Sequence, residues 1–149
     1  GSEMCIRDSK QQFNTLAGKT VGILGFAFKA DTGDTRDSPA IPLCQKLLEE
    51  KARVRIHDPK ALENAREDLR GMQGDVEFVE DPYQACKGAH SIALVTQWQE
   101  YRELDFQRIH DEMVKPAFMF DGRNHLDPQS LHQIGFNVFP LGKKPLLHL

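Results

Sequence analysis

The chain has 149 residues, of which 40% are hydrophobic and 28% are charged, and its formal net charge is -3. This size and balance predict one domain with an ordinary core, and the lack of a long Lys/Arg cluster argues against nucleic acid or an anionic membrane as a partner. No stretch reaches the ~18 consecutive apolar residues of a membrane span, and no signal-peptide core is present, so we expect a cytoplasmic protein.

The N-terminal stretch GSEMCIRDSK shows no periodicity that joins it to the next element. Its first two residues, Gly1 and Ser2, are typical of a cloning scar, and such segments are left out of fold reasoning. We therefore interpret residues 1–12 as a non-native leader, 13–143 as the domain and 144–149 as a tail.

From Lys19 onward, apolar runs of strand length alternate with amphipathic runs of helix length. This alternation predicts an α/β fold, namely a doubly wound, mostly parallel, six-stranded Rossmann-like sheet with helices on both faces and strand order 3-2-1-4-5-6. The short, polar third run predicts an edge strand. The six predicted strands cover residues 20–27, 53–58, 76–80, 90–96, 117–122 and 136–142.

The first predicted helix covers residues 39–51, with Ser38 as N-cap and Pro39 in the first turn. Its apolar stripe at helical spacing consists of Ala40, Leu43, Cys44, Leu47 and Leu48. The remaining crossovers are predicted as helices over residues 62–70, 82–88, 101–113 and 128–135. Asp81 and Asp127 each precede a proline as caps, and Gly88 and Gly135 stand where such helices end.

The turn after the first strand lacks the glycines of a dinucleotide fingerprint. Ala27 and Ala30 occupy the second and third glycine positions of G-x-G-x-x-G, counted from Gly25. The connection to the helix instead spans residues 26–38, whereas such loops usually take ~2 to 6 residues. A long loop at the carboxyl end of the first strand predicts a ligand site.

This loop carries two cations, Lys29 and Arg36, that suit phosphate or carboxylate groups. A third cation, Arg123, stands two residues after Asp121, directly after the fifth strand and at the same edge of the sheet. Side-chain cations from two loops could then replace the helix-terminus phosphate cradle. The alternative is structural, with the loop cations balancing nearby carboxylates in solvated pairs, including Arg123 with Asp121 or Asp127.

The other candidates have weaker signals. Asp58 ends the second strand, where a dinucleotide-binding domain keeps its ribose carboxylate, but the following proline favours a turn and cap residue. Trp98 and Tyr101 are expected to cover the end of the sheet. The histidines form no metal-binding pattern, so no metal is predicted. The cysteines, Cys5, Cys44 and Cys86, predict ordinary reduced thiols.

Four stretches together make the sequence recognisable: LGFAFKADTGDTRDSPA, DPYQACKGAHSIALVTQW, LDFQRIHDEMVKPAFMFDGRN and IGFNVFPLGK. They resemble the C-terminal, UDP-binding domain of UDP-glucose 6-dehydrogenases, in the UDP-glucose/GDP-mannose dehydrogenase family. The resemblance covers nearly everything from about Phe13 to Lys143. The stretch DTGDTR is similar to the UDP-glucose branch, particularly its eukaryotic-type members.

The resemblance implies roles for four residues. Phe28, Lys29 and Arg123 would bind the UDP-sugar substrate, UDP-glucose, and Arg36 would contact the cofactor NAD, which another domain mainly holds. The full enzyme would oxidise UDP-glucose to UDP-glucuronate with two NAD. No catalytic residue is assigned in this chain, since none of the three cysteines stands in the Gly-rich motif of the family's nucleophile.

The expected partners are UDP-glucose, the remaining domains of the dehydrogenase and, in the full-length form, further copies of the same chain. The isolated chain is expected to be inactive. Three alternatives remain: a stand-alone nucleotide-binding or oligomerisation module, the equivalent domain of a related nucleotide-sugar dehydrogenase, and a small NAD-binding protein with Asp58 on the ribose.

Overall fold

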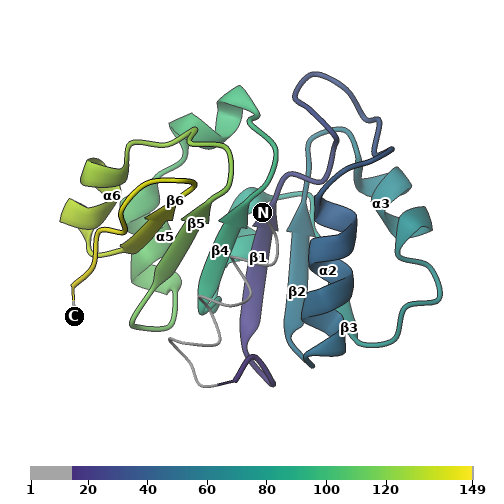
Figure 1. Cartoon of the computed structure of the whole chain (residues 1–149), viewed down its shortest axis with the longest axis horizontal. Coiled ribbons are helices and arrows are strands. Elements are labelled where there is room, and N and C mark those ends of the chain that lie inside the picture. The colour runs from purple at the N-terminus through teal and green to yellow at the C-terminus, as the bar shows by residue number, and fades with distance from the viewer. Residues whose placement is uncertain (1–14, 149) are drawn as a thin grey trace.

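The structure is a computed structural model that describes residues 15–148. The leader predicted over residues 1–12, with Cys5, lies outside the described residues. Figure 1 shows one sheet whose strands run in the same direction, with helices packed against it.

All six strands pair in parallel, in the order β3-β2-β1-β4-β5-β6. This confirms the predicted order and the predicted edge position of the third strand. The strands are β1 (Thr20–Leu24), β2 (Arg53–His57), β3 (Asp75–Phe78), β4 (Ser91–Leu94), β5 (Phe118–Asp121) and β6 (Asn137–Pro140).

The strands are shorter than the predicted runs because the chain turns away while it is still apolar. After β1, Gly25 adopts a φ of 97°, and a Cβ built there would lie 2.4 Å from Thr96 Cβ. Phe26 and Ala27 are therefore buried in the loop rather than in the strand. A run of hydrophobic residues indicates which residues are buried but not where the strand ends, and here the buried residues extend past the strand.

The helices are α2 (Ala40–Glu49), α3 (Leu62–Asp68), α4 (Pro82–Cys86), α5 (Phe106–Glu112), α6 (Pro128–Ile134) and the 3-10 helix η1 (Gln99–Glu103). The predicted stripe of α2 is confirmed, since each of its five residues is buried. The helix begins at Ala40, one residue later than predicted, with Pro39 in the N-cap position. Pro39 already has helical φ and ψ, and Ser38 Oγ accepts a hydrogen bond from the Ala40 backbone N–H at 3.2 Å, so Ser38 still caps this first turn.

The single helix predicted over residues 101–113 is wrong. The structure divides it into η1 and α5, because Leu104 is extended, with φ -69° and ψ 152°. Asp105 then caps the new helix by accepting from the Arg108 backbone N–H at 3.0 Å. This cap allows a second helix, α5, to begin at Phe106, shortly after η1 ends.

The remaining helix ends follow the predicted signals. Asp81 accepts from the Tyr83 backbone N–H, and Asp127 accepts from the backbone of Gln129. The chain turns left-handed at Gly88 after α4 and has φ 133° at Gly135 after α6. Both aspartates and both glycines therefore do what the sequence indicated.

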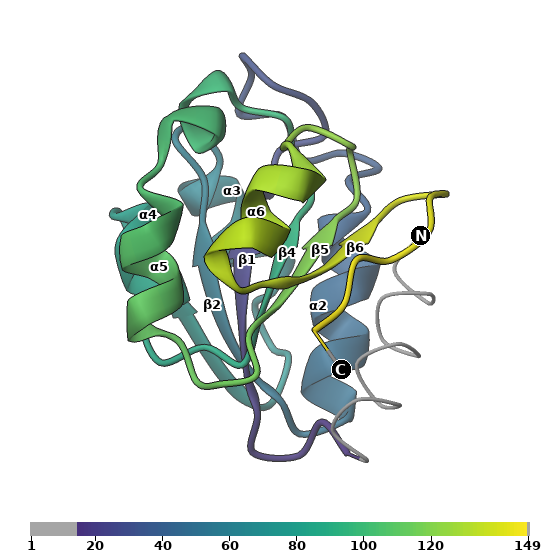
Figure 2. The ribbon, with the colours of Figure 1, turned by 90° about the vertical axis from the view of Figure 1, so that its left-hand side faces the viewer.

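Helices lie on both faces of the sheet, with α2 on one side and α4 and α5 on the other (Figure 2). After β6, the chain folds back so that Leu146 pairs with Val138 in both directions, at 2.8 and 2.9 Å. Among the described residues, no helix has the length and hydropathy needed to cross a membrane.

Candidate functional site

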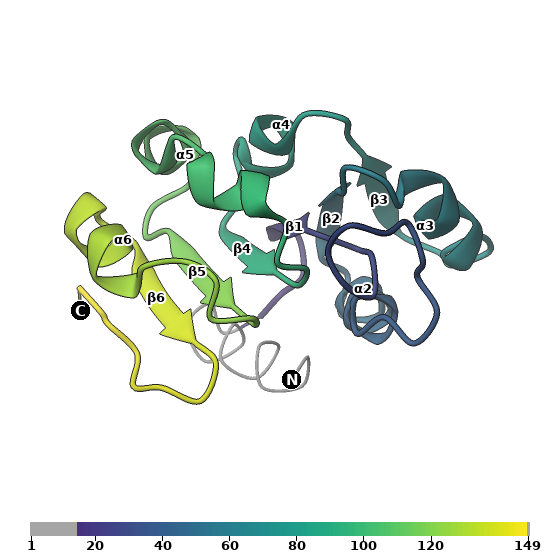
Figure 3. The ribbon, with the colours of Figure 1, turned by 90° about the horizontal axis from the view of Figure 1, so that it is seen from above.

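The carboxyl ends of four strands form one level edge. Leu24 of β1 pairs with His57 of β2 and with Leu94 of β4, and Leu94 pairs with Asp121 of β5. Figure 3 looks onto this edge, where the loops after β1 and β5 flank the segment after β4. Since the chain order reverses between β1 and β4, this is the position at which the fold class binds ligands.

Asp58, directly after β2, fixes the base of the first loop. Its Oδ2 accepts from the backbone N–H groups of Phe26 and Ala27, at 2.8 and 2.9 Å. Its Oδ1 accepts from Lys60 and Ala61, both at 2.8 Å. The amides that would face a pyrophosphate in a dinucleotide fold are therefore already bonded within the protein.

Asp58 also accepts from the indole Nε1–H of Trp98 at 3.1 Å and is only 3% exposed. A carboxylate with these partners cannot also hold a ribose. This geometry confirms Asp58 as a turn residue, although it does not cap α3, whose N-cap is Ala61 without a side-chain capping bond. It also argues against NAD bound by Asp58.

The start of α2 is also occupied, because Ser38 both caps the helix and closes the first loop. Its hydroxyl donates to the Phe26 carbonyl oxygen at 2.7 Å while accepting from Ala40. The backbone N–H groups at the base of the first loop and the hydroxyl before α2 are therefore already engaged, and a ligand would meet the outer part of the loop.

The outer part of the first loop is held against the segment after β2. Gly33 sits so close to it that an added Cβ would lie 2.8 Å from the Lys60 carbonyl oxygen, and Asn64 Nδ2 donates to the Gly33 carbonyl at 2.6 Å. The Phe28 N–H donates to the Asp34 carbonyl at 2.8 Å. The loop thus has a defined shape.

Two predicted residues of the first loop, Phe28 and Lys29, face outward. The Phe28 side chain is 44% exposed, the highest value among the exposed large hydrophobic residues within 15–148. Lys29 is exposed, and within residues 15–148 no carboxylate lies at ion-pair distance from its amine. The structural alternative of a solvated ion pair is therefore not observed for Lys29.

Arg36 behaves differently from Lys29. Its Nε and Nη2 donate to both oxygens of Asp34, at 2.7 to 3.1 Å. Hydrogen bonding to Arg36 lowers the pKa of the Asp34 carboxyl to about 2. Arg36 itself is 87% exposed. The solvated pair foreseen as an alternative is present here, and the predicted role of Arg36 toward NAD stays a prediction.

The second loop repeats the pattern of the first with local contacts. Asp121 accepts from the Arg123 backbone N–H through Oδ1 and from His125 and Leu126 through Oδ2. The Arg123 side chain is exposed and forms no ion pair with Asp121, Asp127 or any other described residue. The structure therefore leaves this guanidinium available.

Three residues other than glycine in these two loops have left-handed backbone conformations. Asp31 and Asp37 in the first and Asn124 in the second have φ values of 68°, 59° and 51°. Such conformations cost free energy for residues other than glycine, although Asn and Asp tolerate them best. The surrounding hydrogen bonds hold both loops in this form.

The segment after β4 joins the two loops. Trp98 and Tyr101 are buried, as predicted, at 6% and 0% exposure. Besides the Trp98 contact with Asp58, Nε2 of His125 lies 2.8 Å from the Trp98 carbonyl oxygen. Nothing in the sequence spacing pointed to His125, which stands two residues after Arg123.

The cysteines that the structure describes, Cys44 and Cys86, are buried thiols. Burial raises the pKa of Cys44 to about 12 and raises that of Cys86 as well. Neither is an activated nucleophile. Between residues 15 and 148, no three His, Cys, Asp or Glu side chains are grouped so that they could hold a metal ion.

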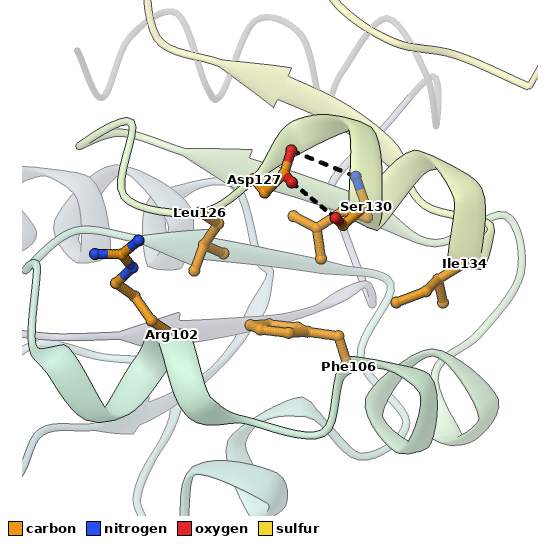
Figure 4. Close-up of a pocket in the computed structure, with 7 residues that line it drawn as sticks. Arg102, Phe106, Leu126, Asp127, Ser130 and Ile134 are labelled. Carbon is orange, nitrogen blue, oxygen red and sulfur yellow. Dashed lines mark hydrogen bonds between the residues drawn. The ribbon is translucent and has the colours of Figure 1, made fainter.

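Of the cavities lined by residues 15–148, two are near the carboxyl edge, and neither is lined by Phe28, Lys29, Arg36 or Arg123. One, of about 230 Å³, lies between α5 and α6 (Figure 4), where Asp127 is engaged by the Ser130 hydroxyl at 2.8 Å. The other, of about 350 Å³, lies beside β2 and is lined by His57, Asp58, Pro59, Lys60, Leu62, Glu63, Arg66 and Glu80. Phe28, Lys29 and Arg123 instead present an exposed surface.

Comparison with known proteins assigns the family. The sequence model of the UDP-glucose/GDP-mannose dehydrogenase family, UDP binding domain, matches residues 22–128. The chain belongs to this family. It is 46% identical over 149 residues to UDP-glucose 6-dehydrogenase 5 of Oryza sativa subsp. japonica and 45% identical over 150 residues to UDP-glucose 6-dehydrogenase 1 of Arabidopsis thaliana. Each alignment covers 88% of the chain and 31% of the relative, so the chain spans about a third of their length.

Solved structures agree on the fold. A UDP-glucose dehydrogenase from Pyrobaculum islandicum is 28% identical, with a TM-score of 0.72 over 91% of this chain and 29% of that one. A UDP-D-ManNAc dehydrogenase from Pyrococcus horikoshii is 22% identical, with a TM-score of 0.73 over 95% of this chain and 30% of that one. At that identity, the second likeness speaks for the fold alone.

Proposed function

We propose that this chain is the UDP-sugar-binding domain of an NAD-dependent UDP-glucose 6-dehydrogenase. Phe28, Lys29 and Arg123 hold UDP-glucose at the carboxyl edge of the sheet. The observation that carries the proposal is that Lys29 and Arg123 have no ion-pair partner among the described residues, while the backbone N–H groups beneath the first loop are bonded to Asp58.

The chemistry of each residue suits one part of the ligand. Lys29 is a compact charge on a flexible stem, and Arg123 offers a planar set of donors, so together they can neutralise a diphosphate. Phe28 is 44% exposed and supplies an apolar face for a ring to cover. The strands that lead to the two cations are separated only by β4, which corresponds to roughly 10 Å at the strand ends.

Arg36 fits a supporting role toward the cofactor. Asp34 occupies its Nε and Nη2, so a phosphate of NAD would meet the remaining Nη1 or displace the carboxylate. Because the guanidinium is 87% exposed, another domain can bring NAD to it without disturbing the core. NAD, when bound, would accept the hydride from the sugar.

On the basis of its similarity to UDP-glucose 6-dehydrogenases, we propose that the complete protein oxidises UDP-glucose to UDP-glucuronate with two NAD. Cys44 and Cys86 are too buried to serve as its nucleophile, so we propose that this chain is inactive alone. Its partners would be the remaining domains and, in the full-length form, further copies, in the cytoplasm.

The second candidate is the equivalent domain of a related nucleotide-sugar dehydrogenase. It is favoured by the family model that matches residues 22–128, because this model covers GDP-mannose as well as UDP-glucose dehydrogenases. The identity of 46% to the rice enzyme makes UDP-glucose the better first ligand.

Calorimetric titration with UDP-glucose tests the proposal, with GDP-mannose and NADH as matched controls. We expect saturable binding of UDP-glucose at least tenfold tighter than that of either control. Preference for GDP-mannose would select the second candidate. Binding of NADH alone would overturn the proposal, and binding of none of the three would show that the edge is structural in this chain.

A further inference from the structure

A series of hydrogen bonds, joined through the covalent structure of Trp98 and His125, connects the two cationic loops through the segment after β4. It begins in the first loop, where the Ala27 N–H donates to Asp58, and Asp58 also accepts the Trp98 indole N–H. It continues from the Trp98 carbonyl oxygen to His125 Nε2, at 2.8 Å. It ends in the second loop, where His125 N–H donates to Asp121.

The two ends of this series of hydrogen bonds stand beside the proposed ligand-binding side chains. Ala27 precedes Lys29 by two residues, and Asp121, which also accepts the Arg123 N–H at 3.1 Å, precedes Arg123 by two residues. The separation of the two cations therefore depends on the residues that connect the loops. Two of these residues, Trp98 and His125, carry neither of the two proposed ligand-binding charges.

The direction of the His125 contact is fixed by its partner. A carbonyl oxygen only accepts, so Nε2 of His125 must carry the proton and donate to Trp98. His125 is partly buried, and its backbone N–H is held by Asp121, so the ring has little freedom. It acts as a strut between the second loop and the β4 segment.

Other contacts reinforce the connection on the side of the first loop, but beyond the strand ends none of those described below repeats the bond between His125 and Trp98. Thr96 Oγ donates to the Ala27 carbonyl at 2.7 Å, which joins the β4 segment to the first loop. On the other side, the Gly122 N–H donates to the Leu94 carbonyl at 3.0 Å, which belongs to the end of the strand. Beyond that strand end, the contact between His125 and Trp98 joins the β4 segment to the second loop.

We infer that His125 and Trp98 are positioning residues, which set the separation of Lys29 and Arg123 for a ligand that contacts both loops. This inference rests on the proposed function, because it concerns the same nucleotide-sugar site. Holding two loops in place before binding removes the cost of ordering them when the ligand arrives. Neither residue needs to touch the ligand.

The test compares His125→Leu, which cannot donate, with His125→Gln, whose Nε2 can take the place of the histidine Nε2. The control is His132→Leu, which removes a bond of the same kind, from Nε2 to the Leu147 carbonyl at 2.9 Å, on α6. Two quantities are measured in each protein: hydrogen exchange of the Trp98 indole N–H and the affinity for UDP-glucose. Trp98 is the only tryptophan, so its indole signal is unambiguous.

His125 holds the Trp98 backbone, and the Trp98 indole N–H donates to Asp58. We therefore expect the indole proton to exchange faster in His125→Leu than in the unmodified chain, and to regain its protection in His125→Gln. We expect UDP-glucose affinity to fall about fivefold in His125→Leu and to recover in His125→Gln. The dependence of that affinity on salt should stay unchanged, because both ligand-binding charges remain.

Failure of this inference is distinguishable from failure of the proposed function. If the unmodified chain binds UDP-glucose and His125→Leu binds it equally well, the positioning role is wrong while the proposed function stands. If the indole proton exchanges freely in the unmodified chain, its bond to Asp58 does not persist, the connection between the two loops is broken at Trp98, and the positioning role is wrong. If the unmodified chain does not bind UDP-glucose, the proposed function fails, and the positioning role fails with it.

Discussion

Two aspartates organise the two cationic loops, and they do so over very different sequence distances. Asp58 accepts hydrogen bonds from residues up to 40 positions away, across the first loop, its own turn and the β4 segment. The Asp121 carboxylate, among residues 15–148, accepts from backbone N–H groups within five positions of itself. One carboxylate therefore ties the first loop to several segments of the sheet edge. The Asp121 carboxylate shapes only its own turn, and other side chains, Asn124 and His125, join that turn to Leu141 and Trp98.

The comparison is tested most strongly by Asp58→Ala and Asp121→Ala. Asp58→Ala leaves donors from three segments unsatisfied in a buried position, and we expect a loss of about 3–5 kcal/mol of unfolding free energy. Asp121→Ala should cost about 1–3 kcal/mol, because its donors lie in a turn that can open locally.

Urea denaturation measures both losses. If Asp58→Ala does not fold, Asp58→Asn, which keeps one accepting oxygen, replaces it. Equal losses at the two positions would contradict the long-range role of Asp58.

Substitution of the glycine at the start of each loop, Gly25 and Gly122, is expected to destabilise the protein by different amounts. Gly25 has a φ of 97°, and an added Cβ would meet Thr96 atoms at 2.4 to 2.6 Å, so Gly25→Ala should cost about 2–4 kcal/mol. Gly122 would place its Cβ 3.1 Å from the Leu94 carbonyl, and Gly122→Ala should cost less than about 1 kcal/mol. Thermal unfolding of both variants decides the order, and a larger loss at Gly122 would refute it.

Ser38→Ala is expected to have an intermediate effect, of about 1–2 kcal/mol. It removes the α2 cap and the 2.7 Å bond to the Phe26 carbonyl together. Ser130→Ala on α6 is its counterpart near the second loop, where the hydroxyl meets the exposed Asp127, and should cost less. Chemical denaturation that ranks Ser130 above Ser38 would contradict this account.

The smallest expected effect concerns the Asp34 carboxyl, whose pKa is lowered to about 2 by its hydrogen bond with Arg36. A carboxyl with a depressed pKa in the folded state adds stability above its unfolded value of 3.8, and this is lost as pH falls toward 2. In Arg36→Ala the Asp34 pKa should return toward its ordinary value, as measured by NMR titration. An unchanged Asp34 pKa would mean that the pair does not persist in solution.

Much of the fold could be predicted because its signals are local. The order of the sheet follows from the alternation of apolar runs and amphipathic crossovers, and α2 follows from its stripe and from Ser38. The aspartate caps at Asp81 and Asp127 were readable from the residue and the proline after it. Asp105 carries the same kind of cap, but its position inside an apparently continuous helical pattern concealed it.

The candidate site could be predicted only in part. The position of Lys29, Arg36 and Arg123 at one edge follows from the strand ends. The separation of Lys29 from its carboxylate neighbours, and the pairing of Arg36 with Asp34, depend on loop geometry that spacing does not reveal. The bonds from Asp58 to Trp98 and from His125 to Trp98 join segments 40 and 27 positions apart, for which no local pattern exists.

The measurement that tests the central claim most directly is calorimetric titration of UDP-glucose into Lys29→Ala and Arg123→Ala, with Arg70→Ala on the surface near α3 as control. We expect each of the first two variants to lose about 1–3 kcal/mol of binding free energy, the range for a charged hydrogen bond, and the control to lose none. Unchanged UDP-glucose affinity in both variants would contradict a nucleotide-sugar site built from these two loops.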